Sequence, residues 1–288
     1  MKAPDFDYER PADLPGALDL LARHGAEASL IAGGQSLLTL LNFRLAAPEL
    51  LIDIGRLAAL KQLVETDRHI EIGGLLRHCD LAASPLIARA LPLLHQAIGH
   101  IAHPAVRHRG TIGGSLAMAD PAAELAACCL ALDGQFSLLS TRGQRWVAAG
   151  DFFQGIYATA LAPDEILTAV RLPKGEPGGI SIFDEVARRR GDFALAGLAF
   201  AATPQAGGLK GVRLALLGVA DRPILARDTM ALLESGPLNQ ARVEQAAARI
   251  VGEVDPPEDP AYPPAYRRHL VGVLLRRTLQ RVLMAFSA

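Results

Sequence analysis

Two pairs of adjacent glycines constrain this chain more than any other feature. The first lies in "LIAGGQSLL" (residues 30–38) and the second in "TIGGSLAMADPAAE" (residues 111–124). Glycine at a strand end lets the backbone turn with positive φ, and the missing Cβ lets a ligand approach the peptide N–H groups. An apolar helical pattern follows each pair, so helix N-termini would add positive potential. We therefore predict two turns that cradle an anion, of a kind suited to a pyrophosphate.

Neither motif has the glycine spacing of a Rossmann nucleotide site or a P-loop. A single glycine pair is more often a purely structural turn, whereas two pairs that share a polar residue and a helix start are more specific. Gln35, Ser36, Thr111 and Ser115 add side-chain donors beside the pairs. A third glycine pair lies at residues 73–74, so successive pairs are forty residues apart. Because the flanking residues differ, we interpret that spacing as chance rather than as a repeat.

Composition excludes several classes of function. The 288 residues carry 29 basic and 30 acidic side chains, so nothing predicts binding to nucleic acid or to an anionic membrane surface. No apolar run is long enough to predict a membrane span, and the first residues do not resemble a secretory signal, so we expect a cytoplasmic protein. Cys79, Cys128 and Cys129 include no CxxC pair, which predicts free thiols and no metal centre in this chain.

Short β and α elements alternate through the first part of the chain. We predict a helix over 14–24, a helical region over 75–100 interrupted at Pro85 and Pro92, a loop over 103–110, and a helix that Asp120 caps. The predicted strands cover 28–34, 50–54 and 69–74, then a hairpin over 134–148 and a strand over 165–173. The glycine and proline content of residues 174–179 predicts a linker. A second lobe then has strands at 180–189 and 209–220, followed by helices at 238–251 and 264–286.

The sequence offers no obvious catalytic side chain. No Ser/His/Asp or Cys/His arrangement stands out, and the histidines at 95, 100, 103 and 108 lack ligand spacing, so we interpret them as structural or solvent-facing. The segment "ARRR" (187–190) is interpreted as a solvated basic edge, with an anion site as the alternative. This absence fits a protein whose chemistry belongs to a cofactor.

The two glycine motifs belong to an ordered set of segments that resembles a known family. "AGGQS" (32–36), "TIGGS" (111–115), "DPAAELAA" (120–127) and "VARRRGDFALAG" (186–197) are similar to the FAD-binding medium subunit of molybdenum hydroxylases, the xanthine dehydrogenase and carbon monoxide dehydrogenase family. Within it they look most like bacterial N-heterocycle hydroxylases such as nicotine dehydrogenase. The resemblance spans nearly the whole chain.

The resemblance implies an α+β protein with the FAD-binding fold shared with vanillyl-alcohol oxidases, the PCMH type. Residues 1–177 would form this domain, as two α+β subdomains at about 1–55 and 56–177 with FAD between them. Residues 178–288 would form a C-terminal lobe of antiparallel sheet and helices.

The resemblance also implies a set of cofactor-binding residues, with no catalytic and no metal-binding residue. Ile101 and Phe193 would lie near the isoalloxazine ring, Glu124 would hydrogen-bond a sugar hydroxyl, and Leu167 would contact the cofactor. Two departures stand out: Ser115 replaces a frequent Asn, and Asp184 and Glu185 stand where some members carry Lys. One side of the pyrophosphate would be lined by Ala32, Gly33, Gly34, Gln35, Ser36 and Leu37, and the other by Thr111, Ile112, Gly113, Gly114 and Ser115.

The implied function is electron transfer in a heterotrimer. A large subunit would hold molybdopterin and a small subunit two [2Fe–2S] clusters, whose electrons would pass through FAD to an external acceptor, and two heterotrimers would form a dimer. The alternatives are a stand-alone flavin oxidase or reductase of the same fold, and a scaffold subunit without flavin. The substrate would never touch this chain, so its sequence does not identify it.

Overall fold

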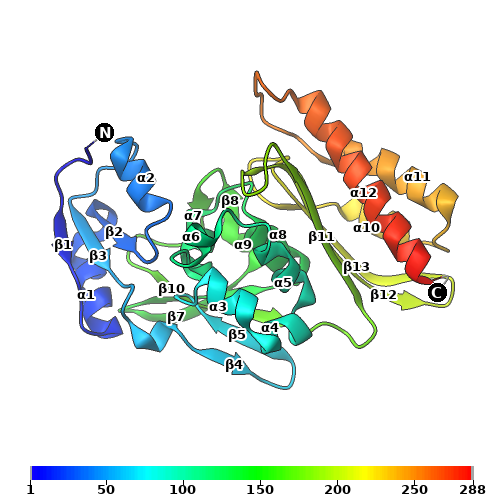
Figure 1. The fold of residues 1–288 in the computed structure, drawn as a ribbon. Coiled ribbons are helices and arrows are strands. Elements are labelled where there is room, and N and C mark those ends of the chain that lie inside the picture. The colour runs from blue at the N-terminus through cyan, green and yellow to red at the C-terminus, as the bar shows by residue number, and fades with distance from the viewer. Residues whose placement is uncertain (1, 287–288) are drawn as a thin grey trace.

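The computed structural model describes residues 2–286 and shows helices packed around several small β-sheets (Figure 1). The N-terminal sheet is parallel, in the order β1 (Asp7–Glu9), β3 (Leu50–Asp53), β2 (Ala28–Ile31). Helix α1 (Leu14–His24) packs against β3, and Asp13 caps it by accepting a hydrogen bond from the Gly16 N–H at 2.9 Å. The predicted first helix and first two strands are therefore present.

The second sheet is antiparallel and mixes strands that are far apart in sequence. Its order is β4 (Leu63–Glu65), β5 (His69–Gly73), β10 (Ile166–Pro173), β6 (Gln135–Ser140), β7 (Gly143–Ala148). β6 and β7 form the predicted hairpin. Strand β10 thus lies between β5 and β6. This position brings Leu167 close to the third glycine pair, at residues 73–74.

Three helices lie beside this sheet, and proline sets their boundaries as predicted. They are α3 (His78–Ala83), α4 (Pro85–Ala90) and α5 (Pro92–Ile98). Pro85 and Pro92 each occupy the first turn of the next helix, where a missing N–H costs nothing. Pro104 does the same for the short α6 (Pro104–Arg107), so the prediction of a continuous loop over 103–110 is wrong for these four residues.

The helix that follows the second glycine pair starts later than predicted. Asp120 Oδ1 accepts a hydrogen bond from the Ala122 N–H at 2.9 Å, which closes a turn instead of capping a helix. Helix α8 begins at Glu124, runs to Ala131 and has Ala123 at its N-cap. The prediction that Asp120 caps this helix is therefore wrong.

The C-terminal lobe is an antiparallel sheet in the order β11 (Ile180–Ala187), β12 (Ala194–Gln205), β13 (Gly208–Leu217), β14 (Ile224–Leu225). Helices α10 (Arg227–Glu234), α11 (Gln240–Arg249) and α12 (Pro264–Phe286) follow, so strands precede helices as predicted. β12 and α10 were not predicted. No helix among residues 2–286 combines the length and apolar character that crossing a membrane requires.

Helices α5 and α8 join the two parts of the molecule. They pack against each other and against the C-terminal sheet, whose β12 also contacts α12 (Figure 1). Every residue of α8 after Glu124 is buried, as expected for a helix that is apolar on all sides. Arg213 of β13 donates a hydrogen bond to the Ala131 carbonyl at 3.2 Å, at the C-terminal end of this helix.

The three cysteines differ in accessibility, which gives a simple test of this packing. Cys128 and Cys129 are fully buried in α8, and burial raises the pKa of both thiols well above the usual range. Cys79 is half-buried, and burial together with Asp80 raises its pKa more modestly. We expect Ellman's reagent to titrate only Cys79 in the native chain and all three thiols in guanidinium. Rapid native labelling of more than one thiol would contradict the packing of α8.

Candidate functional site

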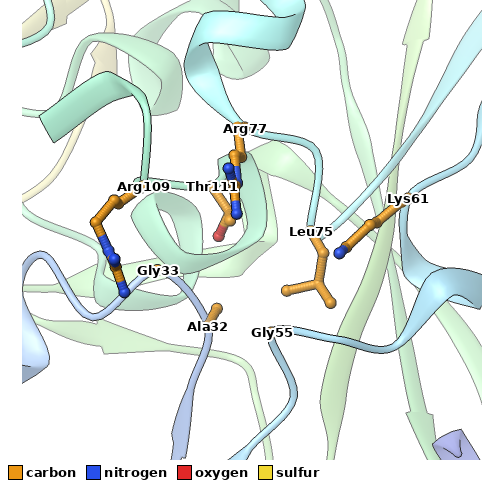
Figure 2. Close-up of a pocket in the computed structure, with 8 residues that line it drawn as sticks. All are labelled: Ala32, Gly33, Gly55, Lys61, Leu75, Arg77, Arg109 and Thr111. Atoms are coloured by element: carbon orange, nitrogen blue, oxygen red, sulfur yellow. The ribbon is translucent and has the colours of Figure 1, made fainter. Parts of the chain in front are cut away.

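The two predicted glycine loops meet in space. A Cβ on Gly33 would lie 2.0 Å from the Arg109 carbonyl oxygen, and one on Gly114 would lie 3.9 Å from the Ala32 Cβ. A pocket of about 80 Å³ opens between the loops (Figure 2). It is lined by Ala32, Gly33, Gly55, Lys61, Leu75, Arg77, Arg109 and Thr111.

The first loop has the predicted turn. It follows β2, and Gly34 has a φ of +73°, a conformation that glycine adopts without strain. Gln35 supports the turn, since its side-chain amide donates to the Gly33 carbonyl at 3.1 Å. Within the part of the chain that the structure describes, the N–H groups of residues 33–36 donate to no protein acceptor. These amides are therefore available to an anion, before the short helix α2 (Leu37–Asn42) begins.

The second loop differs from its prediction. Gly113 and Gly114 lie in the first turn of α7 (Ile112–Met118) and follow a single β-bridge between Thr111 and Arg77, not a strand. Thr111 caps this helix, because its Oγ1 accepts from the Gly114 N–H at 3.1 Å. The Gly113 N–H donates to the Gly74 carbonyl at 2.8 Å. The prediction of a positive-φ turn with open N–H groups is wrong here, and what this loop presents is the Thr111 side chain and a surface without Cβ atoms.

The third glycine pair supports the second loop. A Cβ on Gly113 would lie 2.6 Å from the Gly74 oxygen, and one on Gly74 would lie 2.5 Å from the Leu167 oxygen. Three backbone segments therefore pack at distances that only glycine permits. The sequence assigns residues 73–74 no role, and the structure places them in the layer beneath the loop. Leu167, a predicted cofactor contact, is buried in this same layer.

Three cations around the pocket were missed by the sequence analysis. Lys61, Arg77 and Arg109 all line it, and Figure 2 shows Arg77 and Lys61 turned toward the space between Thr111 and Leu75. Among residues 2–286, these three side chains take part in no ion pair, whereas most of the other arginines have a carboxylate partner. Unpaired cations beside open amides create positive potential that favours an anionic ligand. Their separation in sequence hid them, since the first and the last are 48 positions apart.

The remaining predicted residues, Ile101, Glu124 and Phe193, do not line this pocket. Ile101 is buried, and the Arg107 guanidinium donates a hydrogen bond to the Ile101 carbonyl oxygen at 2.6 Å. Phe193 is 72% exposed, in the turn between β11 and β12. Gly191 of this turn lies against Ala102, because a Cβ on Gly191 would be 3.0 Å from the Ala102 oxygen. The chain therefore brings Ala102 and Gly191 together, while the roles of Ile101 and Phe193 beside a flavin stay predictions.

Positive φ values occur at five non-glycine residues within residues 2–286, including Arg44 and Asp133. Ala102, Ala119 and Tyr157 have φ values of +41°, +51° and +53°, which non-glycine residues adopt rarely. Tyr157 lies next to Ala119, whose carbonyl accepts its N–H at 3.3 Å, and its hydroxyl donates to Asp120 at 3.4 Å. Strained conformations of this kind concentrate at ligand sites.

Glu124 and Glu185 also approach this region. Glu124 is half-buried at the start of α8, and burial raises the pKa of its carboxyl to about 8. Glu185 lies in β11 and Asp184 precedes it. Its Oε1 lies 3.4 Å from His100 Nδ1, while Asp184 Oδ2 lies 3.7 Å from Arg277 Nη2. The sequence could not show where these side chains point.

The other predicted features have ordinary structural roles. Residues 188–190 form an exposed turn in which Arg188 pairs with Asp192 at 3.2 Å, which favours the solvated interpretation of the basic segment. His95 Nε2 lies 3.1 Å from the Ala82 carbonyl oxygen. No group of His, Cys, Asp or Glu side chains within residues 2–286 is arranged to hold a metal ion.

The pocket residues fit the diphosphate of a dinucleotide. The first loop supplies open amides, the second supplies a hydroxyl, and three unpaired cations balance the negative charge. The missing Cβ of Gly33 lets the first loop approach Arg109, and the missing Cβ of Gly113 lets the second loop pack on Gly74. These features match an anion that bridges both loops and do not require a particular sugar or base.

Comparison with known proteins identifies the two parts of the chain. Residues 4–175 match the family described as the FAD binding domain in molybdopterin dehydrogenase. Residues 181–282 match the CO dehydrogenase flavoprotein C-terminal domain. Together these matches cover most of the chain, and they confirm the resemblance found in the sequence.

Curated relatives agree with this assignment over nearly their whole length. The 6-hydroxypseudooxynicotine dehydrogenase complex subunit alpha of Paenarthrobacter nicotinovorans is 38% identical, over 98% of this chain and 96% of that protein. The nicotine 6-hydroxylase medium subunit of the same organism is also 38% identical, over 97% of this chain and 98% of that protein.

Solved structures show the same fold. A chain of the carbon monoxide dehydrogenase of Hydrogenophaga pseudoflava superposes with a TM-score of 0.94 at 35% identity, covering 96% of both chains. One from the quinoline 2-oxidoreductase of Pseudomonas putida 86 gives 0.94 at 34% identity, covering 99% of both. The protein therefore belongs to the FAD-binding medium subunits of the molybdenum hydroxylase family of oxidoreductases.

Proposed function

We propose that this chain is the FAD-carrying subunit of a heterotrimeric molybdenum hydroxylase, with the pyrophosphate of FAD between its two glycine loops. The pocket supports this proposal most directly. The N–H groups of residues 33–36 are open, and Lys61, Arg77 and Arg109, which line the same pocket, form no ion pair within residues 2–286. A neutral ligand would leave these cations uncompensated.

In this proposal the chain binds and orients the cofactor and contributes no catalytic side chain. Residues 32–37 line one side of the pyrophosphate and residues 111–115 the other, with Ser115 donating one hydrogen bond. Ile101 and Phe193 border the isoalloxazine ring, Leu167 supports the layer beneath, and Glu124 binds a sugar hydroxyl. Arg77, Arg109 and Lys61 neutralise the phosphates.

We propose the partners by analogy with the family. A small subunit would hold two [2Fe–2S] clusters, a large subunit would hold molybdopterin and the substrate, and two heterotrimers would form a dimer. Bound FAD would supply the redox centre that takes electrons from the clusters and gives them to an external acceptor. We place the complex in the cytoplasm, where free thiols such as those of Cys128 and Cys129 persist.

Purification of the tagged chain from its host tests the assembly. We expect the purified material to show flavin and iron–sulfur absorption and to contain two further chains. A yellow protein that purifies alone would favour a stand-alone flavin oxidase or reductase. A colourless protein that takes up no FAD would favour a scaffold subunit and would contradict the assignment of both glycine loops.

The three cations give a second test. We expect Arg77→Gln and Arg109→Gln each to weaken FAD binding about tenfold, because a charge-assisted hydrogen bond contributes roughly 1.5 kcal/mol. Lys61→Gln should have a smaller effect, since its ammonium is more strongly hydrated. FAD titration of the apo chain, followed by flavin fluorescence at two salt concentrations, measures these changes.

The exposed Arg227, far along the chain in α10, provides a matched control. Arg227→Gln should bind FAD as the wild type does and should show the same salt dependence. If the three pocket variants behave like this control, the phosphates lie elsewhere.

A further inference from the structure

A short antiparallel pair of backbone segments, residues 76–78 and 110–112, carries two of the pocket residues. The segments exchange two backbone hydrogen bonds of 3.0 Å, and Arg77 pairs with Thr111 between them. Side chains alternate between the two faces of such a pair. Arg77 and Thr111 share the face that lines the pocket (Figure 2), so the side chain of His78 lies on the opposite face.

His78 packs on this rear face, directly across from Gly110. Its N–H donates to the Gly110 carbonyl, and a Cβ on Gly110 would lie 3.1 Å from both Cε1 and Nδ1 of the imidazole ring. The same Cβ would lie 3.1 Å from the Val106 carbonyl oxygen, which accepts the Gly110 N–H at 2.7 Å. Gly110 is therefore held between the ring and helix α6. It also joins two residues that line the pocket, Arg109 and Thr111.

The His78 ring is buried and uncharged. The residue is 4% exposed, and neither ring nitrogen has a hydrogen-bond partner in the described chain, residues 2–286. Burial lowers the pKa of His78 to about 4; the Thr111 backbone opposes this shift and the charge of Arg107 adds to it. Arg107 is fixed in place, because its guanidinium donates to the Ile101 and Ala102 carbonyls at 2.6 and 2.8 Å. Around pH 7 the ring therefore acts through its shape and not through a charge.

Buried ring nitrogens without partners cost stability that an apolar side chain of similar size would not cost. Departures of this kind concentrate at functional sites. We propose that His78 is a positioning residue of the anion pocket, because its flat ring holds Gly110 in place. The flanking residues Arg109 and Thr111 thereby stay where both can contact one anion. This inference rests on the proposed function, which identifies that anion as the diphosphate of FAD.

Removal of the ring tests this role. His78→Ala leaves a cavity behind Gly110 into which residues 109–111 can move, so we expect FAD to bind the apo chain about tenfold more weakly. Competition by inorganic pyrophosphate, which probes the anion pocket alone, should weaken in parallel. Free imidazole can enter a cavity of its own shape, so it should restore most of the lost affinity in His78→Ala and leave the wild type unchanged. Flavin fluorescence titrations with and without imidazole measure these effects.

Ile87→Ala provides the matched control for loss of stability. Ile87 is fully buried in the neighbouring helix α4, which contributes no residue to the pocket or to the antiparallel pair. Its truncation also leaves a cavity and lowers the free energy of unfolding. We expect Ile87→Ala to bind FAD as the wild type does, with no response to imidazole.

A double-mutant cycle tests the contact itself. Gly110→Ala places a methyl group 3.1 Å from the His78 ring, so the ring or the loop must shift, and we expect about fivefold weaker FAD binding. In the His78→Ala background the ring is absent, and the same substitution should cost less affinity. Strictly additive losses would mean that the ring and the glycine do not act on each other, and would overturn the inference.

The outcomes distinguish this inference from the proposed function. If the wild type binds FAD and His78→Ala binds it equally well, or if Ile87→Ala loses as much affinity, His78 has no positioning role and the proposed function stands. An affinity that imidazole does not restore would also overturn the inference. If His78→Ala cannot be purified, Gly110→Ala decides, and wild-type affinity in that variant overturns the inference. If the wild type binds neither FAD nor pyrophosphate, both the proposed function and this inference fail.

Discussion

Replacing Gly33 by alanine is expected to weaken FAD binding at least a hundredfold, a loss of about 3 kcal/mol or more. The new Cβ would lie 2.0 Å from the Arg109 oxygen and 2.7 Å from the Arg109 carbonyl carbon. These are backbone atoms, which cannot rotate away as a flexible side chain can. The two loops must therefore separate, and the open amides move away from Thr111. FAD titration of the purified apo chain measures the loss.

Alanine substitutions at two further glycines provide a comparison for this result. Gly34→Ala keeps more space but requires a φ of +73°, which costs an alanine roughly 1 kcal/mol, so we expect about a fivefold loss. Gly150→Ala meets no atom within 4 Å and should bind FAD as the wild type does. If Gly33→Ala is too unstable to purify, a comparison of the FAD affinities of Gly34→Ala and Gly150→Ala still tests the loop. Equal affinity in all three variants would contradict the close packing of the loops.

The second large effect concerns the stability of the chain without FAD. Glu124→Gln should remove a pH dependence of about 5 kcal/mol in the free energy of unfolding, the equivalent of raising a carboxyl pKa from 4.5 to about 8. The folded chain binds this proton more tightly than the unfolded chain. The stabilisation that the protonated Glu124 carboxyl gives the folded chain is therefore complete below pH 4.5. It disappears as pH rises to about 8. Denaturant unfolding at pH 5, 6.5 and 8.5 gives the comparison.

The difference between the wild type and Glu124→Gln isolates Glu124, because the other groups titrate in both proteins. The pKa of His100 is raised, so its contribution has the same sign. The pKa values of Asp53 and Glu165 are lowered by their hydrogen-bond partners, so their contribution is lost only in acid. Glu258 is exposed, so Glu258→Gln should follow the wild type at every pH. Parallel curves for the wild type and Glu124→Gln would mean that Glu124 is solvated in the folded chain.

Part of this fold follows from local chemistry and could be predicted from sequence. Pro85 and Pro92 start helices because the proline ring fixes φ and lacks an N–H, whatever lies around them. The β6–β7 hairpin and the order of strands and helices in the C-terminal lobe also follow from local patterns. Thr111, by contrast, satisfies the Gly114 N–H, so a segment expected to be an open turn became a capped helix.

Strand β12 shows where local patterns fail. Its sequence, "ALAGLAFAATPQ", is rich in alanine, which favours a helix when it is taken alone. In the structure this strand pairs with β11 on one side and β13 on the other, and helices α8 and α12 contact it. Small side chains suit a central strand that is covered by helices. Tertiary packing therefore overrides the local preference.

The sequence by itself determined the family and the first glycine turn, because each depends on residue type and on short-range order. Only the tertiary structure decided which distant groups share the site. It brought together Lys61, Arg77 and Arg109 around one pocket, placed the glycine pair at residues 73–74 beneath the second loop, and turned Glu185 toward His100. Charge interactions and close packing depend on distance in space, and distance along the chain does not encode it.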